Sequence, residues 1–241
     1  MNKQEFITKL FEAFEQNGLK DILSDGAAEK LYQFKEMLVE TNKCFNLTAI
    51  TDDEGIILKH FVDCAAVTRH INACSRLVDV GCGAGFPSMP IAILREDVQV
   101  TSLDSTAKKI NFINESAEKI GLNNIKAVVS RAEDHAKDYR EGYDVAISRA
   151  VARLNILDEI CIPLVRIDGI FIAMKSSKSE EELTEASNGI KKLGATLKES
   201  KHLILRFMGN EIERDFLVFK KTSATPLQYP RNYSQISKKP L

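Results

Sequence analysis

The chain has 241 residues, of which 44% are apolar, 33 are basic and 34 are acidic, so its formal net charge is −1. This length fits one large domain, or one domain with a small appendage. A near-neutral composition does not by itself indicate a nucleic-acid partner. No uncharged apolar run reaches the roughly 18 residues of a membrane span, and the first residues do not resemble a signal peptide. We therefore expect a cytoplasmic protein that does not enter a membrane.

The cysteines and histidines do not form a ligand pattern. The five cysteines are scattered and odd in number, and none of them has C-x-x-C spacing. The four histidines are equally dispersed. We expect free thiols in a reducing compartment, and no metal site.

Region 1–72 is predicted to be a helical extension. Apolar residues at helical spacing predict helices over residues 2–16 and 26–43, and a further helix is predicted over residues 56–71. This last helix carries His60, which by itself suits a packed or surface position as well as a site. No strand is predicted before residue 77, so region 1–72 precedes the main domain.

A glycine-rich loop follows the first predicted strand. Residues 77–88 read Leu-Val-Asp-Val-Gly-Cys-Gly-Ala-Gly-Phe-Pro-Ser, which predicts a strand, a tight turn and the start of a helix. Glycine is needed where a backbone turns through positive φ or lies directly against a ligand. The spacing is D-x-G-x-G-x-G, typical of methyltransferases that use S-adenosylmethionine, rather than the G-x-G-x-x-G of dinucleotide sites. A glycine-rich turn in an unrelated α/β protein is the alternative. The predicted cofactor contacts in this loop are Asp79, Gly81, Cys82, Gly83, Gly85 and Phe86.

Strands and helices alternate from residue 77 to residue 175. This alternation predicts an α/β, Rossmann-like parallel sheet with helices on both faces. Ligands of such sheets bind beyond the carboxyl ends of the strands. The residues expected to converge on that rim are Asp79, Asp104, Ala132, Arg149 and Lys175.

Two positions on this rim suit an adenosine. Asp104 ends the second predicted strand, where a carboxylate can accept hydrogen bonds from both ribose hydroxyls. A cap for the helix predicted over residues 106–120 is the alternative. The segment 131–133 follows the third strand and is placed to read an adenine edge.

The C-terminal part is predicted to contain two late strands and a tail. Strands near residues 203–207 and 215–220 would add the antiparallel hairpin that is typical of methyltransferase sheets. We place the cofactor-binding domain at 73–222 and an extended basic tail at 223–241. Residues 216–241 contain no acid and five bases, which are Lys220, Lys221, Arg231, Lys238 and Lys239. These bases either bind RNA phosphates or lie on a solvated, disordered tail.

Eight short motifs occur in the order seen in one bacterial family. They are Asn46-Leu47-Thr48-Ala49-Ile50, His60 with Asp63, the Gly81–Pro87 loop, Leu103-Asp104-Ser105, Arg131-Ala132-Glu133, Arg149-Ala150-Val151-Ala152, Lys175 and Tyr229-Pro230-Arg231. In this combination, from about Leu31 to the last residue, the chain resembles the glucose-inhibited division protein B family. These proteins are the bacterial 16S rRNA guanine-N7 methyltransferases, also called RsmG.

The resemblance implies a class I methyltransferase fold with an N-terminal helical extension. It also implies that guanine 527 of 16S rRNA is methylated with S-adenosylmethionine as donor, in naked RNA, in the 30S subunit or in its assembly intermediate. By matched position, the cofactor site then includes Gly81, Phe86, Asp104, Ala132, Glu133 and Arg149, and we also expect Ser105, next to Asp104, to belong to it.

The chain departs from the family at three places. Family members often have Trp where Thr41 stands, Ser where Cys64 stands, and a Gly-containing basic segment where residues 232–235 lie. The last departure leaves open how this tail contacts RNA. A monomer is the default expectation.

Methylation of guanine N7 needs no general base, because the ring nitrogen already has a free lone pair. Alignment of nucleophile, methyl group and sulfur is therefore the main requirement. We name no catalytic residue and treat Arg149, Lys175 and His60 as positioning candidates, since a cation beside N7 would oppose the developing charge. Two other functions remain open: a ribosome-binding module that holds the cofactor without turnover, and a small-molecule methyltransferase. The first predicts cofactor affinity without product, and the second predicts activity that does not need residues 224–241.

Overall fold

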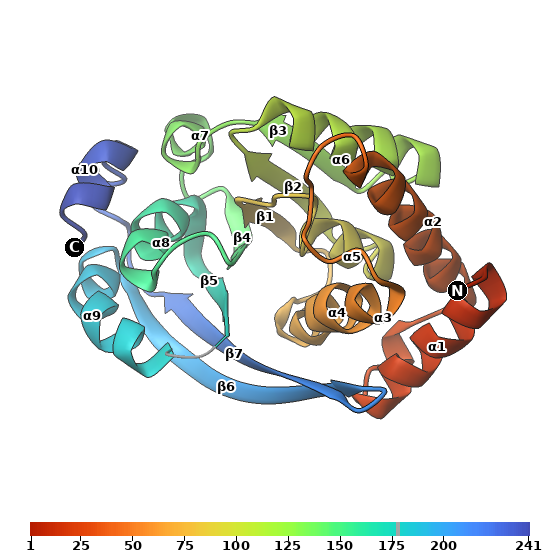
Figure 1. Ribbon diagram of the computed structural model, residues 1–241. Coiled ribbons are helices and arrows are strands. Elements are labelled where there is room, and N and C mark those ends of the chain that lie inside the picture. The colour runs from red at the N-terminus through yellow and green to blue at the C-terminus, as the bar shows by residue number, and fades with distance from the viewer. Residues whose placement is uncertain (177–178) are drawn as a thin grey trace.

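The computed structural model describes residues 1–176 and 179–241 around one seven-stranded sheet (Figure 1). The strand order is β3-β2-β1-β4-β5-β7-β6; the first five strands are parallel, and β7 is antiparallel to both of its neighbours. The order reverses between β1 and β4, where open α/β sheets bind ligands. The predicted α/β sheet and C-terminal hairpin are confirmed. The strands are β1 Arg76–Val80, β2 Gln99–Asp104, β3 Ile125–Val129, β4 Tyr143–Arg149, β5 Val165–Lys175, β6 Ala195–Phe207 and β7 Asn210–Lys221.

One face of the sheet is covered by the N-terminal helices together with α5 and α6 (Figure 1). Their apolar side chains share one core with alternate residues of the strands, such as Leu77 of β1. The region predicted as one helix over 56–71 is a composite that begins with a π-helical segment, continues as an α-helix and ends as a 3-10 helix. The elements on this face are α1 Lys3–Gln16, η1 Lys20–Ile22, α2 Asp25–Asn42, α3 Asp53–Gly55, η2 Ile56–Val62, α4 Asp63–Ala66, η3 Val67–His70, α5 Ser88–Leu94 and α6 Ala107–Ile120.

The opposite face carries a second core. Val78 and Val80 point to this side, because successive side chains of a strand alternate between the two faces. The helical elements here are α7 Ala132–Tyr139, α8 Leu154–Cys161, η4 Ile162–Leu164, α9 Ser179–Lys192 and α10 Tyr233–Lys238. The sheet therefore separates two apolar layers.

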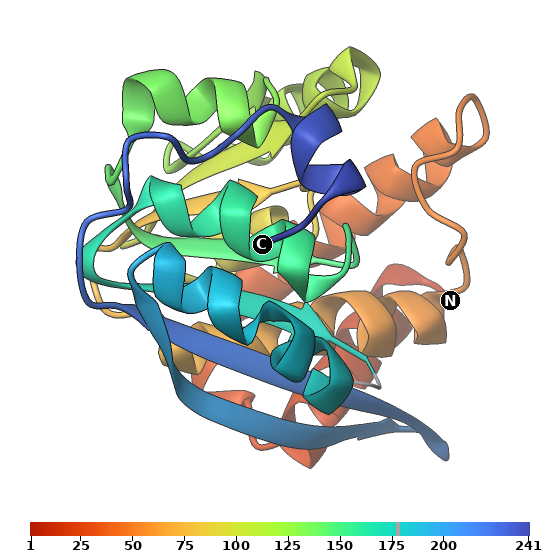
Figure 2. The same ribbon diagram turned by 90° about the vertical axis from the view of Figure 1, so that its left-hand side faces the viewer.

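The C-terminal tail is ordered, which corrects the expectation of an extended or disordered segment. After β7 the chain returns along the second face and ends in the short helix α10 beside α8 (Figure 2). Ile236 of α10 is fully buried in the second core. The sequence prediction failed here because a tail rich in Ser, Pro and Lys shows no helical periodicity, and Ile236 is its single fully buried apolar residue.

None of the helices in the described ranges is long and apolar enough to cross a membrane.

Candidate functional site

The glycine loop connects β1 to α5 and forms the floor of the site. Gly81, Gly83 and Gly85 have φ values of +75°, +57° and +93°, in the left-handed region that side chains avoid. A Cβ at Gly81 would lie only 2.4 Å from Cγ2 of Val151, in the segment that follows β4. The backbone N–H of Gly81 also donates to the carbonyl oxygen of Leu103, at 2.8 Å. The loop thus packs closely against both neighbouring strand ends, which confirms why glycines occupy it.

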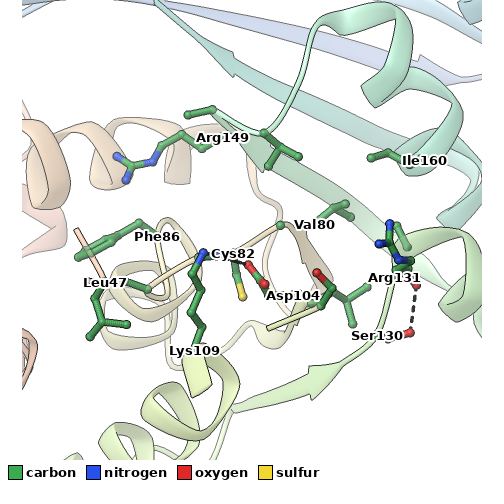
Figure 3. Close-up of a pocket in the computed structure, with 18 of the residues that line it drawn as sticks. Leu47, Val80, Cys82, Phe86, Asp104, Lys109, Ser130, Arg131, Arg149 and Ile160 are labelled. Atoms are coloured by element: carbon green, nitrogen blue, oxygen red, sulfur yellow. Dashed lines mark hydrogen bonds and ion pairs between the residues drawn. The ribbon is translucent and has the colours of Figure 1, made fainter. Parts of the chain in front are cut away.

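A cavity of about 500 Å³ opens above this loop (Figure 3). Leu47, Phe86 and Arg149 lie at one end, and Ser130 and Arg131 lie at the other (Figure 3). The predicted cofactor residues that line it are Gly81, Cys82, Gly83, Phe86, Asp104, Ser105, Ala132, Glu133 and Arg149. Its volume lies within the range of small-molecule sites.

Asp104 stands at the middle of the cavity, at the end of β2. Its Oδ2 accepts from the N–H of Gly83 at 3.1 Å, and its Oδ1 accepts from the N–H of Thr106 at 2.8 Å. Lys109 Nζ lies 3.8 Å from Oδ2. The N-cap position of α6 belongs to Thr106, so Asp104 is not the helix cap that the sequence left open. The carboxylate is oriented by these donors and lines the cavity.

Asp79 and Gly85, which were predicted to contact the cofactor, do not line this cavity. Asp79 is fully buried, and its Oδ2 accepts from the N–H of Ser88 at 3.1 Å, at the start of α5. Burial raises the pKa of this carboxyl to about 7. Gly85 packs against Met89, whose Cγ would lie 2.7 Å from an added Cβ. Both residues therefore support the loop from below.

A buried ion cluster holds Arg149 at the end of β4. Asp63, with no exposed surface, accepts from Arg149 Nη1 at its Oδ2 and from Arg214 Nε at its Oδ1, both at 3.0 Å. Breaking such a buried pair leaves a charge without compensation. Arg214 was not predicted from the sequence, because it belongs to no recognisable motif and precedes the strand expected at 215–220; in the structure it lies within β7.

His60 links this cluster to the cavity. Its ring stacks on Phe86 with centroids 4.0 Å apart, and its Nδ1 lies 3.2 Å from Arg149 Nη2. Because arginine only donates, Nδ1 accepts and the ring proton lies on Nε2, which donates to Thr48 Oγ1 at 3.0 Å. Burial, aided by the charge of Arg149, lowers the pKa of His60 to about 3. The imidazole is therefore neutral at physiological pH.

A second cavity of about 510 Å³ adjoins the first. His60, Arg149, Ala150 and Val151 line both cavities and so form a shared wall. Four further basic side chains line the second cavity, and these are Lys59, Arg153, Lys175 and Arg214. Lys175 donates to the carbonyl oxygen of Ala152 and pairs with Glu182, each at 2.7 Å.

The five bases predicted to contact RNA are not brought together. Lys221 has 1% of its surface exposed; its Nζ donates to Ile162 O at 3.1 Å and lies 3.3 Å from Glu141. Burial lowers the pKa of Lys221 to about 8, and its side chain does not reach the surface. Lys220 pairs with Asp168 beside the amino-terminal half of β5, away from the cavity rim.

The other three bases lie on the ordered tail. Arg231 is bound by the buried Glu159. Lys238 and Lys239 are exposed at the end of α10. In the ranges that the structure covers, no group of three or more His, Cys, Asp or Glu side chains could hold a metal ion.

The residues that line the first cavity fit S-adenosylmethionine. The glycine loop offers bare backbone, and Asp104 offers a carboxylate suited to a ribose diol. The fold resembles that of the precorrin-6y C5,15-methyltransferase of Geobacter metallireducens, with a TM-score of 0.53 and 14% identity, covering 66% of this chain and 87% of that one. It also resembles the fold of TrmN from Thermus thermophilus, with a TM-score of 0.52 and 18% identity, covering 66% of this chain and 48% of that one. The [4+2]-cyclase SpnF is equally similar, with a TM-score of 0.55 and 14% identity, covering 68% of this chain and 82% of that one. The fold alone therefore does not define the reaction. Fold and site together define a protein with a class I methyltransferase fold whose cavity lining suits S-adenosylmethionine.

Sequence comparison narrows this class to one family. The model of the family described as rRNA small subunit methyltransferase G matches residues 27–207. A ribosomal RNA small subunit methyltransferase G of Clostridium perfringens is 45% identical over 88% of this chain and 90% of its own length. The protein of the same name from Exiguobacterium sibiricum is 42% identical over the full length of both chains. The chain belongs to the rRNA small subunit methyltransferase G family.

Proposed function

We propose that this enzyme transfers the methyl group of S-adenosylmethionine to N7 of guanine 527 in 16S rRNA, within the small ribosomal subunit or its assembly intermediate in the cytoplasm. The observation that carries the proposal is the pair of adjoining cavities with a shared wall. One cavity suits the cofactor, and the other has the basic lining that suits an RNA segment. The family name supports ribosomal RNA as the substrate.

We assign the ends of the cofactor cavity by their chemistry. Asp104 would hold the ribose, and the segment 131–133 would hold the adenine. The opposite end, between Phe86 and Arg149, would then hold the methionine part next to the shared wall. When bound, the cofactor supplies a sulfonium methyl group as the electrophile.

The side chains at the shared wall fit attack by a neutral ring nitrogen. Guanine N7 carries a free lone pair, so no side chain must remove a proton. His60, with a pKa of about 3, would not serve as a base at physiological pH, and its role is to hold Phe86 and Arg149 in place.

Two carboxylates reduce the positive charge at the wall, which favours the same reaction. Asp63 is shared by Arg149 and Arg214, and Glu182 pairs with Lys175. A guanine that becomes cationic at N7 would therefore face cations whose charge is offset in part. Arg149 and Lys175 are assigned to positioning the cofactor and the RNA.

The test is methyl transfer from labelled S-adenosylmethionine to 30S particles and to naked 16S rRNA that lack the modification. Digestion and mass spectrometry identify the methylated nucleoside, and cleavage of the RNA at 7-methylguanosine maps its position. We expect 7-methylguanosine at position 527. Another nucleoside or another position would overturn the proposal, and cofactor binding with no methylated product would favour a binding module.

A matched pair of variants tests the basic cavity. Lys59→Ala removes an exposed charge from its lining, and Lys198→Ala removes an exposed charge outside both cavities. We expect only the first to weaken binding of the particle, with a smaller dependence on salt. Equal effects of the two variants would contradict this location of the RNA.

A further inference from the structure

The C-terminal segment 222–241 is fixed to the second face of the molecule by buried or bidentate contacts. Arg140, which follows α7, donates from Nη1 to the carbonyl oxygen of Tyr229 at 2.6 Å and from Nη2 to that of Pro226 at 3.0 Å. These contacts hold the backbone of the segment, so its path does not depend on exposed side chains.

A second attachment lies closer to the end of the chain. Glu159 of α8 has no exposed surface, and its Oε1 accepts from both the backbone N–H and the Nε of Arg231, at 2.9 and 2.8 Å. Arg231 Nη2 also donates to the carbonyl oxygen of Lys239 at 3.1 Å. Arg231 thus ties α8 to both sides of α10.

Helix α10 is specified by residues within and just before it. The side chain of Asn232 caps the helix by accepting from the N–H of Gln235 at 3.0 Å. Ile236 is buried beneath the helix, and Tyr233 in the first turn lines the cofactor cavity. Figure 2 shows α10 beside α8, above the sheet.

Tyr233 lies at the adenine end of that cavity. The guanidinium carbon of Arg131 is 5.5 Å from its ring centroid, and 37% of the residue surface is exposed. Arg131 itself follows β3 in the segment assigned to adenine. An aromatic ring at this position can stack on a base and exclude water from it.

We propose that the C-terminal segment is part of the cofactor site and that Tyr233 is a binding residue for the adenine of S-adenosylmethionine. The segment places α10 across the end of the cavity, and its main function is retention of the cofactor rather than contact with RNA. This inference needs the adenine end to be assigned as above, but it does not depend on which RNA base is methylated.

The test measures the dissociation constant of S-adenosylhomocysteine, which binds without turnover, by calorimetry on the full chain. Base stacking on an aromatic side chain corresponds to about a tenfold change in affinity. We expect Tyr233→Ala to weaken binding by about tenfold and Tyr233→Phe to retain it. Leu227→Ala is the matched control, since Leu227 lies in the same segment with 91% of its surface exposed.

RNA binding by the same variants separates the two roles of the segment. Unchanged cofactor affinity in Tyr233→Ala, with an intact thermal transition, would overturn the proposal. If Tyr233→Ala lost affinity for RNA but not for the cofactor, the proposal would also be overturned, and the segment would be an RNA contact. Arg231→Ala should release α10 and weaken the cofactor as Tyr233→Ala does, whereas Lys238→Ala should leave cofactor affinity unchanged.

Discussion

Asp79 is expected to reduce the stability of the folded enzyme at neutral pH. Its carboxyl is fully buried between β1 and α5, and Oδ1 has no hydrogen-bond partner among the described residues. Replacement by asparagine keeps an oxygen for the N–H of Ser88 and removes the ionisable group. We expect Asp79→Asn to be more stable than the natural chain at pH 8.

The size of the effect follows from the pKa. Folding raises the pKa of Asp79 from its usual 3.8 to about 7, chiefly through burial. Well below pH 3.8 the group is protonated in both states and costs nothing. As the pH rises to 7, the unfolded chain loses the proton while the folded chain keeps it, so stability falls. A difference of about three pH units at 1.36 kcal/mol each is roughly 4 kcal/mol, reached near pH 7 and constant above it.

Urea unfolding of both proteins between pH 5 and pH 8 measures this difference. The advantage of Asp79→Asn should be about 1.6 kcal/mol at pH 5 and should grow to about 4 kcal/mol near pH 7. Asp97→Asn is a control of opposite sign, because the hydrogen bond from Arg95 lowers the pKa of Asp97 to about 2. That variant should lose stability at neutral pH. A stability difference for Asp79→Asn that does not change with pH would refute the assignment of the cost to ionisation.

Three other substitutions test the site. Gly81→Ala should weaken cofactor binding and cost about 1–3 kcal/mol of stability, because its Cβ would clash with Val151 at a positive φ. Calorimetry measures the cofactor affinity, and urea unfolding measures the stability. Unchanged values of both would contradict the clash. Asp63→Asn should cost about 3–5 kcal/mol in urea unfolding, since it leaves Arg149 and Arg214 without a buried partner; a loss below about 1 kcal/mol would contradict this. Lys221→Met should make the free energy of unfolding less dependent on pH between about 8 and 10.5. Burial lowers the pKa of the natural lysine, so the cost of burying its charge disappears as the pH rises through this range. An unchanged dependence of stability on pH in the variant would contradict this explanation.

Much of the cofactor site could be predicted because its signals are local. The glycines of the loop encode positive φ values at alternate positions, and the end of a strand is marked by the polar residue that follows an apolar run, as at Asp104. Parallel strands then bring these ends to one rim whatever the remaining sequence is. The strands and the rim residues Asp104, Ala132 and Arg149 followed from such signals.

The remaining features depend on contacts between distant segments. Lys221 was predicted to contact RNA as one of five bases in a terminal region without acids, but β7 pairs it with Ala195 of β6, and its side chain lies beside Thr225 and Glu141. Arg214 reaches Asp63 from a strand 151 residues later in the chain, and nothing local marks that pairing. Asp79 was predicted to contact the cofactor because of its place in the glycine-loop motif. In the structure it is fully buried in β1, and its carboxylate accepts from the start of α5.

The wall shared by the two cavities has a consequence for inhibitor design. A single molecule that joins an adenosine-like part to a purine-like part could occupy both cavities across His60 and Arg149, and linking the parts would raise their effective concentration. The adenosine part would recognise features found in many enzymes of this fold. Selectivity would come from the purine part, because its cavity is lined by Lys59 of the N-terminal helical region and Arg214 of the C-terminal hairpin.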